Sequence, residues 1–279
     1  MRAHDDGRSS GMMEEARRLL RRLIAEAAVA TDPSPHLVID DVFPARVYER
    51  FQAALPRLEE CRPIEGDNLR VFPLWDDPET PDRDPGDLRH LMHAIFTQEI
   101  ADHFLQRFMP SLTSMYDALF GDQAAAYRDL VRVRDWREAG ALDVRPVGNV
   151  LPAHTDWPNR LVSVVVYLAP AHETWCAAWG TRLYRVAPDA GLDALALMAK
   201  QVEFPDALID RTNYRLLAFR PNRAVAFMNT PWSIHGAEVE GHPEERRWAI
   251  TKGINLPSDV TGKIFGLPVE LRGEENPPD

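Results

Sequence analysis

Cysteine is scarce in this sequence: only Cys61 and Cys176 occur in 279 residues. Two cysteines can build neither a disulfide framework nor a four-cysteine zinc site. No apolar run approaches the roughly 18–20 residues of a membrane span, and the N-terminal segment has no apolar stretch typical of a secretory signal. A Gly-rich phosphate-binding loop and internal repeats are also missing. We therefore expect a cytoplasmic protein with no membrane contact.

Positive charge is in deficit as well. Lysine and arginine total 32, whereas aspartate and glutamate total 43, so the formal net charge is −11. A general nucleic-acid binder needs a basic face for phosphate contacts, and this composition argues against one. The chain is 45% hydrophobic, which is enough for a full core. A small molecule is the partner we expect.

The pattern along the chain changes from helical to β-rich. Residues 13–29 carry leucines at helical spacing, and further helices are predicted over 47–55, 88–108 and 112–120, with a short strand over 36–39. After residue 134, short β-rich runs separated by Gly, Pro, Asn and Asp dominate. We predict one domain over 13–265, with a helical part at 13–130 and a β core at 131–256. Disordered ends are predicted at 1–12 and 266–279, a surface loop at 62–88 and a helical insert at 191–201.

The first informative motif is NVLPAHTDWPNRLVSVVVYL, residues 149–168. His154 and Asp156 lie two positions apart, and alternate residues of an extended segment point to the same side. One imidazole and one carboxylate therefore converge on one point. In the apolar run that follows, Ser163 and Tyr167 are the polar residues, and they share a face.

Two later segments complete the pattern. His235 follows an apolar strand and a turn in AVAFMNTPWSIHGAE, and Arg246 and Arg247 open the strand EERRWAITKGIN. Two histidines and one carboxylate form the ligand set of non-haem iron(II) oxygenases, which leaves coordination positions open for a bidentate cosubstrate and dioxygen. A cosubstrate with a second carboxylate also needs a buried cation, and the planar fork of arginine suits that role.

The segments HTDWPNRLVSVVVYL, AFMNTPWSIHGAEV and RRWAITKGI, in this order, resemble the Fe(II)/2-oxoglutarate-dependent dioxygenases, and most closely their prolyl-4-hydroxylase-like branch. WGTRLYRV, which lies between the first two, looks like the Gly-Gly-x-Leu strand of that family with Trp179 in place of the first glycine. The resemblance covers roughly residues 134–254. It implies a mainly β fold with flanking helices around a double-stranded β-helix, the jelly-roll or cupin-like core.

The resemblance also implies roles. His154, Asp156 and His235 would be the catalytic iron ligands. The activity would be hydroxylation of an unactivated C–H bond, with dioxygen and 2-oxoglutarate consumed and succinate and CO2 released. The substrate is expected to be a small molecule, such as an amino-acid derivative or a natural-product intermediate. Because Asp156 is present, the halogenase variant of the family is disfavoured.

For the cosubstrate, the resemblance assigns the distal carboxylate to Arg247, with Arg246 as the alternative. Tyr167 and Ser163 are further candidate contacts. Arg145, on the strand before His154, is expected either in a surface salt bridge or at an anionic substrate.

Three other readings remain open. One is a peptidyl, prolyl-type hydroxylase. A second is a cupin-like metal-binding or sensor protein without oxygenase activity. The third is a zinc hydrolase with the same ligand set, for which Glu238 is the best candidate general base.

Overall fold

A computed structural model describes residues 3–64, 69–74, 88–136, 140–171, 173–186 and 209–265, with side chains from residue 11 onward. The helices are α1 (Ala3–Glu26), α2 (Ala45–Ala53), α3 (Leu88–Ile95), α4 (Gln98–Phe120), α5 (Ala124–Asp129) and α7 (Ser258–Phe265), with short 3-10 turns at Leu58–Glu60, Gly121–Gln123 and Ala177–Trp179. The strands are β1 (His36–Ile39), β2 (Arg62–Pro63), β3 (Arg70–Pro73), β4 (Ala141–Pro146), β5 (Val150–His154), β6 (Arg160–Leu168), β7 (Thr181–Val186), β8 (Ile209–Leu217), β9 (Arg223–Met228), β10 (His235–Glu238) and β11 (Arg246–Asn255).

These strands form two antiparallel sheets. The larger sheet has the order β1-β9-β6-β11-β4-β3-β2, and the smaller has the order β5-β10-β7-β8. Between β4 and β11 the chain passes back and forth between the sheets, with β4, β6, β9 and β11 in one and β5, β7, β8 and β10 in the other. That eight-strand order is a double-stranded β-helix. The predicted fold class is confirmed.

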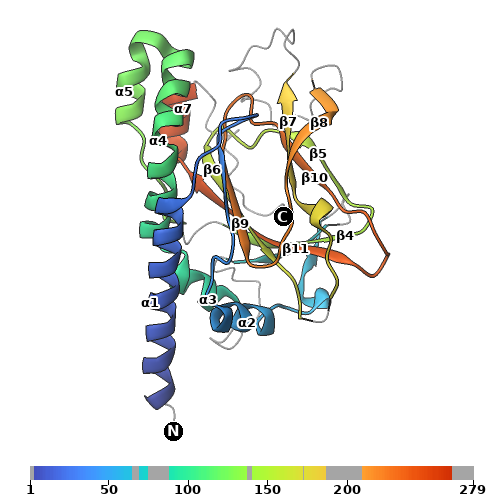
Figure 1. Ribbon diagram of the computed structural model, residues 1–279. Coiled ribbons are helices and arrows are strands. Elements are labelled where there is room, and N and C mark those ends of the chain that lie inside the picture. The colour runs from blue at the N-terminus through green and yellow to red at the C-terminus, as the bar shows by residue number, and fades with distance from the viewer. Residues whose placement is uncertain are drawn as a thin grey trace.

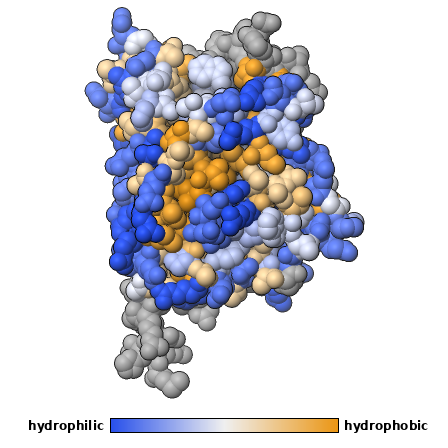
Figure 2. Space-filling view, in the orientation of Figure 1, coloured by the Kyte–Doolittle hydropathy of each residue, from blue (hydrophilic) through white to orange (hydrophobic). Residues whose placement is uncertain are grey.

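Strand β6 shows how the sequence fixes the layers. Successive side chains of a strand point to opposite faces. Val162 and Val164 therefore join the core cluster beneath the helices, whereas Val165 and Tyr167 join the cluster between the sheets. Helices α1 and α4 lie along one side of the large sheet (Figure 1). In the same orientation, Figure 2 shows hydrophobic residues gathered near the middle of the surface turned toward the viewer and framed by hydrophilic ones.

The helical layer differs from the prediction at three places. Helix α1 begins at Ala3, within the segment 1–12 that we predicted to be disordered. A helix anchored by buried side chains such as Leu20 and Ile24 can extend into a polar segment, because each added residue gains a hydrogen bond. The single helix predicted over 88–108 is instead divided at residues 96–97, between α3 and α4. The break predicted before residue 112 is missing, since α4 continues through Pro110. Pro110 is exposed, so the carbonyl that loses its helical partner can face water. None of the described helices is both long and apolar enough to cross a bilayer.

The N-terminal half is not only helical. Strand β1, predicted at 36–39, pairs with β9, and the pair β2 and β3 extends the large sheet beyond β4. Both of these short strands lie in the segment predicted as a loop over 62–88. The rest of that loop is mostly outside the described residues, as are the predicted helical insert at 191–201 and the tail at 266–279.

Candidate active site

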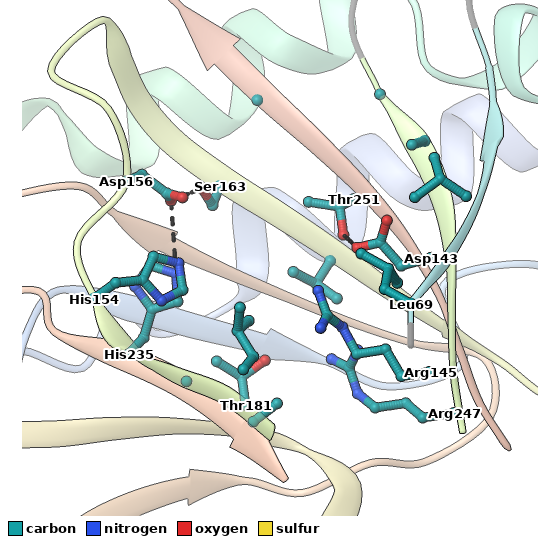
Figure 3. Close-up of a pocket in the computed structure, with 18 of the residues that line it drawn as sticks. Leu69, Asp143, Arg145, His154, Asp156, Ser163, Thr181, His235, Arg247 and Thr251 are labelled. Carbon is teal, nitrogen blue, oxygen red and sulfur yellow. Dashed lines mark hydrogen bonds and ion pairs between the residues drawn. The ribbon is translucent and has the colours of Figure 1, made fainter. Parts of the chain in front are cut away.

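Strand pairing in the small sheet brings the two predicted histidines together. Strand β5 ends at His154, β10 begins at His235, and the two residues lie opposite each other in the antiparallel pair. Their ring centroids are 4.3 Å apart. The chain then turns back, and Asp156 reaches the same point. The ligand atoms of the three residues lie within 4.8 Å of one another, at one end of a pocket (Figure 3).

Backbone carbonyls set the protonation of both imidazoles. Nδ1 of His154 lies 2.8 Å from the carbonyl oxygen of Pro152, and Nδ1 of His235 lies 3.1 Å from that of Ser233. A carbonyl oxygen only accepts, so each Nδ1 carries the proton, and Nε2 is left as the metal-binding atom. Burial, with a smaller contribution from His235, lowers the pKa of His154 to about 4. The His154 ring is therefore neutral near pH 7, as a metal ligand must be.

Asp156 is held as a carboxylate by its neighbours. Burial acts to raise its pKa, but Arg160 and the two imidazoles outweigh this and keep the pKa below its usual range. Nη1 of Arg160 donates to Oδ1 at 3.2 Å, and the hydroxyl of Ser163 donates to Oδ2. Ser163 was predicted as a cosubstrate contact. In the structure its hydroxyl is engaged by Asp156, and Ser163 also lines the cavity described below.

Two further residues shape this end of the site and were not singled out from the sequence. The amide of Asn229 donates to the carbonyls of Asp156 and Trp157, at 3.2 and 2.9 Å, and so fixes the loop between β5 and β6. Gly253 on β11 leaves room for Arg160, because a Cβ there would stand 2.6 Å from Nε of that arginine. Arg160 lies four residues after Asp156. This short spacing of opposite charges is a signal from which their ion pair could have been predicted.

The metal-ligand cluster opens into a cavity of about 490 Å³ that also contains Arg247. Arg247 is buried, its Nε donates to the carbonyl of Trp179 at 2.7 Å, and its guanidinium lies 5.3 Å from the ring centroid of Tyr167. Arg246 lies on the other face of β11 and donates to the carbonyl of Glu244. It does not line this cavity, so the geometry favours Arg247 over Arg246.

Tyr167 was a candidate cosubstrate contact, and in the structure its hydroxyl is hydrogen-bonded within the protein. Its ring is fully buried, and its hydroxyl lies 2.9 Å from Oγ1 of Thr181 and donates to the carbonyl of Leu217 at 3.2 Å. The backbone amide of Thr181 donates to the same hydroxyl at 2.9 Å. Tyr167 does not line the cavity, whereas Thr181 does. Tyr167 therefore supports Thr181 and Arg247 from beneath rather than facing the cavity itself.

Two roles were expected for Arg145, a surface salt bridge or a contact with an anionic substrate. The first does not fit its position, because Arg145 is only 6% exposed and lines the cavity. Its Nη1 donates to Oδ1 of Asn149 at 2.8 Å. It extends beside Arg247 from the neighbouring strand (Figure 3). Its burial could not be read from β4 alone, because it depends on the small sheet that closes over this strand.

A scan against protein-family models and a search of curated proteins found no match. Several solved structures are similar in fold. A prolyl-4-hydroxylase from Pseudomonas putida has 15% identity over 85% of this chain and 99% of that chain, with a TM-score of 0.45. A prolyl hydroxylase from Trichoplax adhaerens, in complex with a hypoxia inducible factor peptide fragment, has 13% identity over 90% and 94%, with a TM-score of 0.44. HygX from Streptomyces hygroscopicus, with nickel, 2-oxoglutarate and hygromycin B bound, has 16% identity over 79% and 82%, with a TM-score of 0.39. These values are low, so the fold assignment rests on the strand order and the site on its own geometry.

Proposed function

We propose that this protein is an Fe(II)- and 2-oxoglutarate-dependent dioxygenase that hydroxylates an unactivated C–H bond of a small molecule. The observation that carries the proposal is the presence of a His-Asp-His cluster and a buried arginine, Arg247, in one cavity. When one end of a dicarboxylate binds a metal, its other carboxylate lies away from the metal. A buried guanidinium can bind that second carboxylate through charge-assisted hydrogen bonds.

The donor set fits iron(II): two neutral imidazole nitrogens and one carboxylate oxygen, with open coordination positions. His154, Asp156 and His235 would hold the metal. When bound, iron with 2-oxoglutarate supplies the oxidising chemistry, with release of succinate and CO2. The protein orients the reactants and keeps water away. Val165 and Phe227 contribute apolar wall, and the Phe227 ring packs 4.5 Å from that of His235.

The size of the cavity supports a small-molecule substrate. Small-molecule sites commonly enclose about 300–1,000 Å³, and this cavity of about 490 Å³ falls in that range. An amino-acid derivative or a natural-product intermediate would fit the mixture of acidic and basic side chains in its lining. Hydroxylation of a peptide is the alternative within the same chemistry. Turnover assays with proline-containing peptides and with free amino acids would separate the two.

The two alternatives from other classes have less support. A zinc hydrolase needs a general base beside the metal, and Glu238 instead accepts a hydrogen bond from Arg182 and does not line the cavity. A cupin-like binder without oxygenase activity would need no buried cation in the cavity, and Arg247 is one.

An anaerobic titration of the protein with Fe(II) and then 2-oxoglutarate tests the proposal. We expect a weak visible charge-transfer band from the iron chelate in the wild type, no band in His235→Ala, and a band that needs far more 2-oxoglutarate in Arg247→Ala. Protein that binds iron but gives no band with 2-oxoglutarate would overturn the oxygenase proposal. Succinate formed under air, measured independently, then reports turnover.

A further inference from the structure

Two arginines, not one, lie at the end of the cavity away from the metal ligands. Arg145 on β4 and Arg247 on β11 are direct partners in the antiparallel register. Residues directly opposite in such a pair project from the same face, with Cβ atoms about 4.5–5.5 Å apart. Both side chains line the cavity and are almost fully buried, at 6% and 4% exposure. Figure 3 shows them side by side.

Each guanidinium group donates a hydrogen bond to an uncharged oxygen. The side-chain oxygen of Asn149 accepts from Nη1 of Arg145, and the carbonyl of Trp179 accepts from Nε of Arg247. Each hydrogen bond occupies one N–H of a guanidinium group and restricts the orientation of that group. The arrangement is therefore pre-oriented, which lowers the entropy cost of binding a ligand between the two groups.

This pair is costly without an anion. Like charges directly opposite in a sheet destabilise it, and burial of charge adds to the cost. Asp143, two residues before Arg145 on the same face, also lines the cavity, and its carboxylate accepts a hydrogen bond from the Thr251 hydroxyl at 3.0 Å. At the metal end, Asp156 and Arg160 pair with each other. A carboxylate bound between the two guanidinium groups would lower this cost.

We propose that Arg145 and Arg247 together bind the distal carboxylate of the cosubstrate, and that Arg145 makes the site selective for dicarboxylate 2-oxo acids. This inference rests on the proposed function. It adds a second arginine, from a different strand, to the contact made by Arg247. The energetic cost of two adjacent buried arginines is offset when the carboxylate bridges them.

Calorimetric titration of the full-length protein loaded with Mn(II), without oxygen, tests the inference. The ligands are 2-oxoglutarate and 2-oxopentanoate, which has the same chain length but a methyl group in place of the distal carboxylate. We expect Arg145→Gln to weaken binding of 2-oxoglutarate by about 10-fold or more, with binding of 2-oxopentanoate unchanged. Arg145→Lys keeps the charge but not the fork, so its loss should be intermediate. Arg246→Gln, on the opposite face of β11, is the matched control and should behave as wild type.

The outcomes separate the two proposals. Wild-type protein that binds Mn(II) but not 2-oxoglutarate would contradict the proposed function itself. Wild type that binds 2-oxoglutarate, with Arg145→Gln binding it equally tightly, would overturn the role of Arg145 and leave the function standing. Equal losses for both ligands, in Arg145→Gln and in Arg145→Lys, would also overturn it, because they indicate a distorted pocket rather than recognition of one carboxylate.

Discussion

The two faces of strand β11 differ in what they do. Toward the small sheet, Arg247, Thr251 and Gly253 line the cavity. Toward the helices, Trp248 and Ile250 belong to the main hydrophobic core. Residues that line the cavity alternate with core residues along the ten residues of β11, so this one strand contributes to both the candidate active site and the hydrophobic core. A substitution on one face should change ligand binding, and a substitution on the other should change stability.

Each face also buries a cation, which sharpens the comparison. Arg247 faces the cavity, whereas Lys252 lies in the core with its Nζ 5.3 Å from the centroid of the Trp136 ring. Burial lowers the pKa of Lys252 to about 7, although the nearby Asp135 carboxylate acts to raise it. A buried charge is therefore not by itself a sign of function. What distinguishes Arg247 is the cavity in front of it.

The largest effect is expected at the metal end. His235→Ala removes one of three ligands, and it should lower metal affinity by more than the roughly 10–100-fold loss caused by removing a supporting residue. Equilibrium titration with Fe(II) or Mn(II) measures it. His103→Ala, on the helical layer and outside the cavity, is the control and should bind metal normally. Equal metal affinity in His235→Ala and wild type would rule out the proposed centre.

Neighbouring arginines give the next largest effect. Arg247→Gln should raise the Kd for 2-oxoglutarate by about 10–100-fold, since a charge-assisted contact is lost, while metal affinity stays unchanged. Arg246→Gln should leave both constants unchanged. Arg246 and Arg247 are adjacent in the sequence, but their side chains lie on opposite faces of β11. A larger effect at Arg246 than at Arg247 would contradict the assigned register.

Part of the centre of the site could be predicted from residue spacing. The two-residue spacing of His154 and Asp156 places them on one side of an extended segment, whereas His235 joined them through the family resemblance, and the structure brings the three together. The period of two also placed Ser163 and Tyr167 on the inward face of β6, and the structure agrees.

The hydrogen-bond partners could not be predicted in the same way. The Tyr167 hydroxyl is bound by Thr181 from another sheet, and Arg145 is buried in a cavity that residues of both sheets line. Both depend on pairings between segments far apart in the sequence. Likewise, β2 and β3 are short and carry prolines, so their local composition predicted a loop. They form strands because β3 pairs with β4 and β2 pairs with β3.

A smaller effect is expected for a residue that only orients a ligand. Ser163→Ala removes the hydroxyl that donates to Asp156, and metal affinity should fall by about 10-fold. Ser114→Ala, which removes a hydroxyl bonded to the carbonyl of Pro110 on α4, should have no effect on metal binding. If Ser163 were instead a cosubstrate contact, as the sequence suggested, its removal would weaken 2-oxoglutarate binding and leave metal affinity intact.

The smallest effect concerns stability on the outward face of β11. The pKa of Lys252 falls from 10.5 in the unfolded chain to about 7 in the folded protein, so the unfolded state binds the proton more tightly. The destabilisation is therefore complete below about pH 7 and fades as the pH rises toward 10.5. Lys252→Met keeps the volume and a sulfur contact with Trp136 but removes the charge. Chemical denaturation should show the variant more stable than wild type by about 1 kcal/mol or more near neutral pH, with the difference narrowing at alkaline pH. Lys263→Met, at a site 61% exposed on α7, should show no such trend. A stability difference for Lys252→Met that stays constant with pH would mean that this lysine is not desolvated, and the contrast between the two faces would then rest on Arg247 alone.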